Sequence, residues 1–276
     1  MPITEAERKY LKNKHKGGKN NAKGNRYENF YAVFQIASLM NSQFERLDNV
    51  YLTSQLSETF VDDLLIEKDN SIRTYHQIKD VKKLTWKNKE LRNDFKRQKD
   101  ISKEREEQFN LKLVYSNIDF SESSPTDFSE CTTTEYFPAF NELSQLYWNF
   151  EPFKNAITFI SAEEKSGDDT LMGIACSILG VWESMNTEIP VSLKEISERV
   201  RKINGYDSLK IYPTIELLEE SKRILDGIGV SFHTNGMTFY WSYGFFNGKI
   251  KWSKEIEQNL IEIAPTKIID LISILS

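Results

Sequence analysis

Three short groups of polar residues near the start of the chain combine the side chains that phosphodiester hydrolysis requires. They are Glu28, the pair Asp62-Asp63, and the segment Gln77-Ile78-Lys79. Such hydrolysis needs a cation to neutralise the phosphate, oxygen ligands to hold that cation, and a group that orients or activates water. Mg²⁺ prefers oxygen ligands and keeps several of its waters, so one or two carboxylates with the substrate phosphate suffice. The residue types therefore predict an Mg²⁺ or Mn²⁺ site, with the lysine beside the attacking water or the phosphate.

Local patterning predicts the elements that carry these groups. Aromatic residues recur at helical spacing from Tyr27 to Phe34, which indicates a helix over residues 26–40 that carries Glu28. Residues 49–53 are typical of a strand, and residues 60–79 of a β-hairpin whose strands, 60–66 and 72–79, flank a polar turn.

The alternation of side chains along a strand then decides which residues meet. Gln77 and Lys79 lie on one face of their strand, and Asp63 can direct its carboxylate toward the same cleft from the partner strand. His76 alternates away from them, so we expect it to be a structural or surface residue. The hairpin therefore predicts one cleft that contains an acid, an amide and a lysine.

These groups and their neighbours resemble a known family in order and spacing. The motifs are Gly24-x-x-Tyr27-Glu28-x-x-Tyr31-Ala32, Val61-Asp62-Asp63-Leu64-Leu65-Ile66 and Tyr75-His76-Gln77-Ile78-Lys79. The set resembles the N-terminal double-stranded DNA endonuclease domain of bacterial anti-phage effectors, as in CBASS effectors with a SAVED sensor domain and in Lamassu complexes. That domain is a PD-(D/E)XK nuclease in which glutamine often replaces the acid of the last motif. The resemblance covers about residues 20–118.

The resemblance implies a role for each residue of the set. It makes Asp63 and Gln77 metal ligands, with the carbonyl of Ile78 as a helper, Glu28 an auxiliary acid near the metal, and Lys79 the catalytic lysine. It implies a Mg²⁺- or Mn²⁺-dependent DNA endonuclease of an anti-phage defence system. The chain departs from the family because little length remains after the nuclease for a SAVED domain. That departure favours activation by a partner protein over activation by a cyclic nucleotide.

Each group also has a simpler explanation. Asp62 and Asp63 could be solvated carboxylates at a strand end, Gln77 and Lys79 an exposed strand face, and Glu28 an acid favoured by the helix dipole. The glutamine in the last motif also leaves open the alternative that the chain is not catalytic. It would then bind DNA or dock to other defence proteins. Cleavage of plasmid DNA in Mg²⁺ distinguishes the nuclease from these alternatives.

The charge distribution predicts a polyanionic partner at one end of the chain. The net charge is −5, yet residues 1–105 contain 22 Lys and Arg against 15 Asp and Glu. We expect residues 1–25 to form a basic, flexible or DNA-ordered arm without a core of its own. A charged helix over residues 86–108 and the preceding loop carry the cations expected to track DNA phosphates: Lys82, Lys83, Lys87, Arg92, Lys96, Arg97 and Lys99. The simpler alternative is a solvated helix surface.

Composition excludes several classes of protein. No apolar run is long enough to span a membrane, and the N-terminus lacks the apolar block of a secretory signal. The chain has two distant cysteines and three histidines, which argues against disulfides and against a zinc site. We therefore expect a cytoplasmic protein without membrane association.

The remaining patterns predict the domain organisation. We expect a strand at 111–116 and, at 156–161, a fifth strand or a lead into the next domain. We expect buried or capped helices at 171–185, 193–203 and 214–228. A hairpin turning on Asn235-Gly236 and two short helices around Pro265 should follow. The predicted fold is α/β, with a restriction-endonuclease-like core (mixed sheet flanked by helices) in residues 1–165. Residues 166–276 would form a helical, winged-helix-like region that regulates or assembles the protein. Its net charge of −4 favours a protein interface, with partner subunits or a second copy, over DNA.

Overall fold

The computed structural model divides the chain into two compact units. It describes residues 3–19, 22–43, 46–69, 71–162, 166–204, 208–210 and 215–275. The first unit comprises Met1–Ile160 and Ser166–Gly205, and the second comprises Ser161–Lys165 and Tyr206–Ser276. The candidate site belongs to the first unit.

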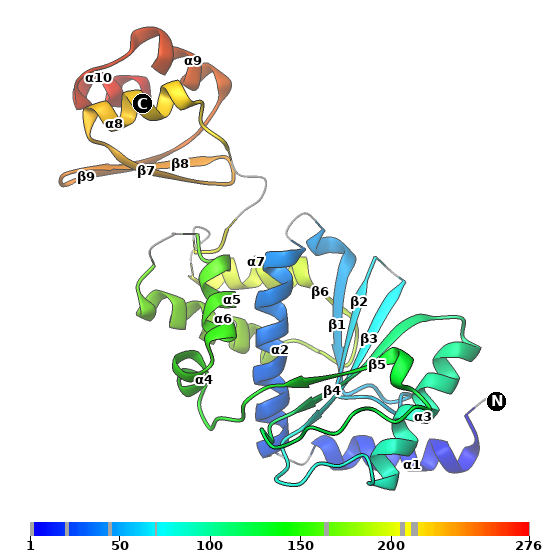
Figure 1. The fold of residues 1–276 in the computed structure, drawn as a ribbon. Coiled ribbons are helices and arrows are strands. Elements are labelled where there is room, and N and C mark those ends of the chain that lie inside the picture. Colours follow the sequence, from blue (N-terminus) through cyan, green and yellow to red (C-terminus); the bar gives the residue numbers. More distant parts are fainter. Residues whose placement is uncertain are drawn as a thin grey trace. The chain divides into compact units, whose positions relative to one another are not determined.

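The first unit is built on a six-stranded mixed sheet with the strand order β5-β4-β3-β2-β1-β6 (Figure 1). Its strands are β1 (Val50–Ser54), β2 (Leu64–Lys68), β3 (Ile72–Lys79), β4 (Gln108–Tyr115), β5 (Thr132–Tyr136) and β6 (Val191–Ser192). The pairs β1–β2, β2–β3 and β1–β6 are antiparallel, whereas β3–β4 and β4–β5 are parallel. The predicted α/β core with a mixed sheet is therefore confirmed.

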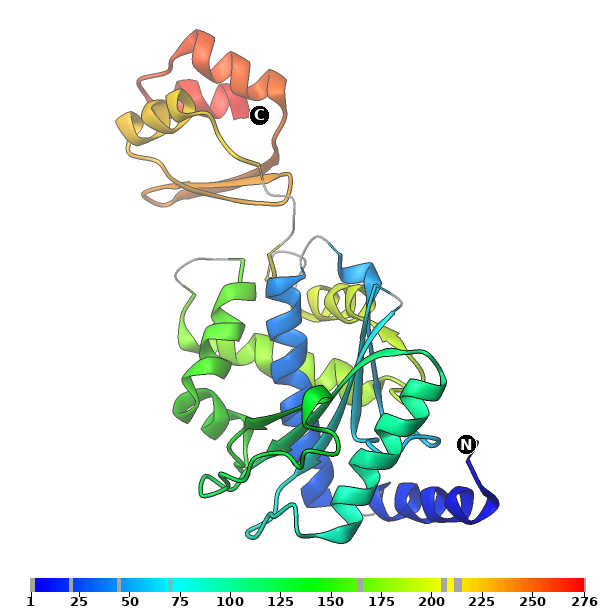
Figure 2. The same cartoon turned by 45° about the vertical axis from the view of Figure 1, so that its right-hand side comes forward.

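Helices cover both faces of this sheet (Figures 1 and 2). The long helix α2 (Ala22–Ser42) lies on one face and packs against α5 (Glu151–Ile160), α6 (Asp168–Ser184) and α7 (Leu193–Asn204). The helix α3 (Lys89–Glu104) lies on the other face, beside α1 (Glu5–Lys19). The short elements are α4 (Leu143–Asn149), η1 (Leu47–Asn49) and η2 (Ser129–Cys131).

The alternation along β3 separates two cores. His76 lies under α2, with its ring centroid 5.7 Å from that of Tyr31. Tyr75 points to the α3 side, into a cluster that includes Trp86, Phe95 and Phe128. Because Gln77 and Lys79 alternate in step with Tyr75, they also face the α3 side of the sheet.

The N-terminal segment differs from the prediction of an arm without a core. Residues 5–19 form α1, and Leu11 is 4% exposed in a small cluster with Phe60 and Ile101. The stretch Gly17-Gly18 hid this helix, because glycine lowers helix propensity. Residues 20 and 21 lie outside the described part of the chain.

Three local features differ from the predictions. The segment 156–161, expected as a strand or a lead into the next domain, lies mostly in α5, whose buried residues Phe153, Ala156, Ile157 and Ile160 follow helical spacing. No strand was predicted at β5, which lies in a Ser/Thr-rich stretch and forms its hydrogen bonds by parallel pairing with β4. The first strand of the hairpin begins at Leu64 and not at residue 60, because residues 60–63 form an irregular segment with bends.

The boundary between the units also differs from the predicted boundary at residue 165. The helices α6 and α7, expected to form a winged-helix-like region with the later hairpin, pack instead on α2 and β1 of the first unit. The reason is that α6 buries Ile174, Ile178 and Trp182 in the core of that unit.

Over its described residues, the second unit contains one small sheet and three helices. They are α8 (Glu219–Ile228), β7 (Ser231–Asn235), β8 (Thr238–Tyr243), β9 (Phe246–Lys251), α9 (Lys254–Ile263) and α10 (Ile268–Leu275). The hairpin turns at Asn235-Gly236 as predicted, with a positive φ of 58° at the glycine, and β9 adds a third antiparallel strand. Phe239, Trp252 and Leu260 lie in its core. In the part of the chain described here, no helix has the length and apolar character needed to cross a bilayer.

Candidate functional site

The hairpin brings the predicted acid, amide and lysine together at one end of the sheet. Leu64 pairs with His76, so Asp63, one residue before β2, lies opposite Gln77. The backbone N–H of Ile78 donates to Asp63 Oδ2 at 2.6 Å, and the side-chain amide of Gln77 donates to the same oxygen. The Nζ of Lys79 lies 3.6 Å from that oxygen. Asp63 is therefore held by its neighbours and points toward the end of β3.

Glu28 reaches the same place from α2. It lines a cavity of about 280 Å³ together with Asp63, Gln55 and Trp182. Burial raises the pKa of Glu28, and the negative charge of Asp63 raises it further, against the opposing effect of Lys79. Gln55 Nε2 donates to Glu28 Oε2 at 2.7 Å. Two carboxylates thus line one cavity, where their negative charges would repel each other.

Asp62 points elsewhere, to a buried cation. Lys14 of α1 lies 3.0 Å from Asp62 Oδ1 and 2.9 Å from Asp94 Oδ2 of α3. Burial and the charge of Asp63 raise the pKa of Asp62, against the effect of Lys14. The carboxylates of Asp62 and Asp63 therefore contact different neighbours, Asp62 a lysine of α1 and Asp63 the end of β3.

The amide of Gln77 lies between these two groups, and its orientation follows from their chemistry. An ammonium only donates hydrogen bonds and a carboxylate only accepts them. Lys14 Nζ donates to Gln77 Oε1 at 3.2 Å, so the amide nitrogen faces Asp63. With the amide in this orientation, Gln77 turns its nitrogen, and not the oxygen expected of a ligand, toward Asp63.

The arrangement matches part of the donor set that a divalent cation requires. Glu28 and Asp63 fit, because they are two carboxylates on one cavity and Mg²⁺ needs no more than this from a protein. Gln77 fits only if its amide turns over, and the role expected of the Ile78 carbonyl stays a prediction. Within the described ranges, no three His, Cys, Asp or Glu side chains are grouped as a metal cluster.

The expected DNA-binding cations divide into two sets. Lys82, Lys83, Lys87 and Lys96 are exposed. The other three pair with carboxylates: Arg92 with Asp127, Arg97 with Glu7, and Lys99 with Glu130. The simpler explanation, that these cations belong to a solvated helix surface, thus fits the three paired residues of α3.

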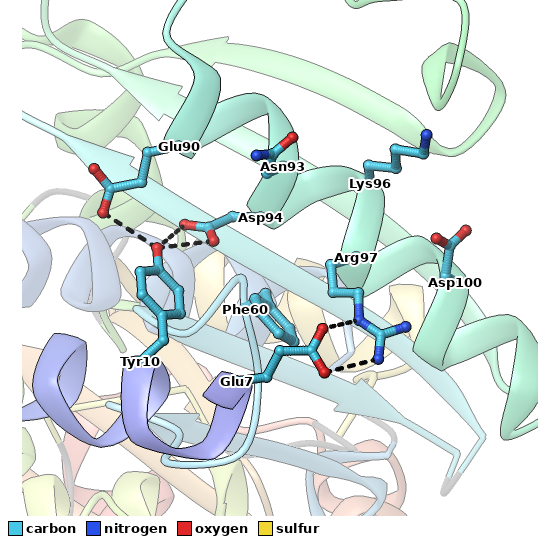
Figure 3. A pocket seen from close by; sticks show the side chains of 9 residues that line it. All are labelled: Glu7, Tyr10, Phe60, Glu90, Asn93, Asp94, Lys96, Arg97 and Asp100. Carbon is cyan, nitrogen blue, oxygen red and sulfur yellow. Dashed lines mark hydrogen bonds and ion pairs between the residues drawn. The ribbon is translucent and has the colours of Figure 1, made fainter. Parts of the chain in front are cut away.

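The side of α3 that faces α1 is lined by polar groups around a second cavity (Figure 3). This cavity measures about 540 Å³. Tyr10 of α1 donates to Glu90 and Asp94, each at 3.1 Å, and Arg97 of α3 contacts Glu7 through both carboxylate oxygens. These contacts join α1 to α3, so α1 is part of the site's surroundings.

Sequence patterns missed three contributors to the site. Lys14 was one of many N-terminal lysines, and Gln55 was an ordinary loop residue, although its positive φ of 53° is uncommon for a side chain of this size. Trp182 of α6 was assigned to the other domain. None of them carries a local signal, because each is placed by packing between distant segments.

No family model, curated protein or solved structure matches this chain.

Proposed function

We propose that this protein is a metal-dependent DNA endonuclease that uses the carboxylates of Glu28 and Asp63. The observation that supports the proposal best is their shared cavity, with Lys79 Nζ 3.6 Å from Asp63 Oδ2. Acids that repel each other in a buried space are favourable for a cation, because binding relieves the repulsion.

Each residue then has a defined task in phosphodiester hydrolysis. Glu28 and Asp63 would hold a Mg²⁺ or Mn²⁺ ion, which would supply positive charge for the phosphate and lower the pKa of a water. Gln55 holds Glu28 by a hydrogen bond, and the N–H of Ile78 holds Asp63. Lys79 is 34% exposed and its Nζ lies 3.6 Å from Asp63 Oδ2, so its charge would orient the attacking water or stabilise the developing negative charge.

The substrate and the partners follow from charge. The exposed lysines at 82, 83, 87 and 96 are suited to binding the phosphates of double-stranded DNA. Residues 166–276 carry a net negative charge and are better suited to binding a protein. We further propose that the nuclease belongs to an anti-phage defence system and is gated by a partner subunit or by self-association, because an ungated nuclease would damage its host.

Plasmid cleavage in Mg²⁺ tests the proposal. The full chain is assayed alone and with the proteins encoded beside it, in wild-type form and as Lys79→Ala. The matched control is Lys68→Ala, which removes a lysine from the other end of the same hairpin. We expect Lys79→Ala to abolish cleavage with little effect on DNA binding, and the control to cleave normally. Activity of Lys79→Ala within a few-fold of wild type would exclude the lysine.

A non-catalytic DNA-binding or protein-docking subunit remains the second candidate. The observation that favours it is the Gln77 amide, which presents nitrogen toward Asp63. This candidate predicts no cleavage under any of these conditions and no binding of Mn²⁺. DNA binding by the isolated protein in low salt would then separate a DNA-binding subunit from one that only docks to proteins.

A further inference from the structure

Lys14 is a buried cation that the proposed chemistry does not use. Its side chain is 18% exposed and lies among four acceptors: Phe60 O at 2.5 Å, Asp94 Oδ2 at 2.9 Å, Asp62 Oδ1 at 3.0 Å and Gln77 Oε1 at 3.2 Å. Phe60 and Asp94 also line the cavity between α1 and α3 (Figure 3). The lysine thus connects α1 to the strand that carries the site.

The position of Lys14 depends on the docking of α1. This helix is held by the Glu7–Arg97 ion pair, by Tyr10 on Asp94, and by Leu11 against Phe60 and Ile101. Among the residues that the structure describes, the cluster around Leu11 has three buried members, so polar contacts provide much of the attachment. Movement of α1 would withdraw Lys14 from the acceptors that surround it.

Lys14 fixes the orientation of the Gln77 side-chain amide. If the amide turned over, its NH₂ group would face the ammonium and its oxygen would face Asp63, giving two repulsive contacts in place of two hydrogen bonds. The amide is fully buried, so water cannot relieve this repulsion. While Lys14 is in place, the oxygen of Gln77 is unavailable to a cation beside Asp63.

We propose that Lys14 is a positioning residue that turns the Gln77 amide away from the cation site, so that the site is complete only when α1 releases the lysine. The inference rests on the proposed cation site of Glu28 and Asp63. The helix α1 then acts as an internal inhibitor, because it controls the orientation of the Gln77 amide.

A double-mutant cycle in Mn²⁺ affinity tests this mechanism. Isothermal titration of the full chain compares wild type, Lys14→Met, Gln77→Ala and the double variant. Lys14→Met keeps the aliphatic stem but removes the donor, and we expect Mn²⁺ affinity to rise about tenfold, the scale typical of outer-shell effects on metal sites. In the Gln77→Ala background the same change should have a much smaller effect, limited to the loss of the lysine's charge, because no amide is left to turn. Lys12→Met, an exposed lysine on the same helix, is the matched control and should leave the affinity unchanged.

The cycle separates this mechanism from simple electrostatics. Loss of a positive charge near Asp62 would raise affinity equally in both backgrounds, and that result would overturn the proposal. An unchanged affinity in Lys14→Met would overturn it as well, while leaving the cation site intact. If no variant binds Mn²⁺, the cation site of the proposed function fails, and the inference fails with it.

Two further variants guard against misfolding, because Lys14→Met leaves Asp62 and Asp94 without their cation. Lys14→Gln fills the same space with an amide that can donate or accept, so it should give part of the gain in affinity. Lys14→Arg keeps a donor-only group and should retain the wild-type affinity. Higher affinity in Lys14→Arg would contradict the proposal, and thermal melting of each variant identifies any that do not fold.

Discussion

His76 should make the stability of the first unit depend on pH. It is 1% exposed beneath α2, and its Nδ1 lies 3.1 Å from the carbonyl oxygen of Leu64. The carbonyl only accepts, so Nδ1 carries the proton of a neutral ring. Burial, followed by the charge of Lys112, lowers the pKa of His76 from 6.5 to about 3. The residue is therefore structural, one of the two roles expected from its alternation with Gln77.

The sign and size of the effect follow from linkage. The unfolded histidine takes up a proton at a higher pH than the folded one, so protonation favours the unfolded state. The stabilisation is complete above pH 6.5 and is lost progressively as the pH falls toward 3. Each pH unit within this window corresponds to about 1.4 kcal/mol. Between pH 8 and pH 5 the free energy of unfolding should therefore fall by about 2 kcal/mol from this group.

Urea unfolding at several pH values, with wild type and His76→Asn, measures this contribution. Asparagine does not titrate, and its amide can donate to Leu64 in place of Nδ1. The difference between the two proteins cancels the other titrating groups, including the acids of the site. We expect the difference to change by about 2 kcal/mol from pH 8 to pH 5. Parallel curves, or an NMR titration giving His76 a pKa near 6.5, would refute the reasoning.

Three further predictions concern the site and its surroundings. In Mn²⁺ titrations, Asp63→Asn should weaken binding far more than Asp62→Asn, because only Asp63 lines the cavity with Glu28; equal losses would mean that the ion lies elsewhere. Glu7→Gln should lower the free energy of unfolding by about 1 kcal/mol or less, since its ion pair with Arg97 is partly exposed, and should speed hydrogen exchange in α1; unchanged exchange would show that α1 does not rely on this pair. In DNA-binding assays, neutralising three exposed lysines should flatten the logarithmic salt slope by up to about 3, and an unchanged slope would mark them as solvated surface: Lys82, Lys83 and Lys87.

Local sequence determined the elements whose contacts are short in range. The hairpin of β2 and β3 and the turn at Asn235-Gly236 formed where alternation and turn residues predicted them. The cap at Ser192, whose Oγ accepts from the N–H of Glu195 at 3.1 Å, is equally local. The meeting of Asp63 with Gln77, Ile78 and Lys79 belongs to this class, because a hairpin register is set by a turn of a few residues.

Tertiary structure decided what those elements pack against. The segment 156–161 is rich in β-formers, yet most of it lies in the helix α5 because its apolar face meets α2. The helix α6 was assigned to the second domain by its place in the sequence, but Trp182 lines the cavity that Glu28 and Asp63 also line. Helical or strand periodicity describes one element at a time and does not specify the partner of its apolar face.

The orientation of the Gln77 amide shows the same limit at the scale of one side chain. Sequence placed Gln77 opposite Asp63 and made it a candidate ligand. Which of its two atoms faces Asp63 depends on Lys14, 63 residues earlier in the chain, which packs beside it through α1. A donor-only ammonium on one side and an acceptor-only carboxylate on the other leave the amide one favourable orientation, and only the folded chain brings both to it.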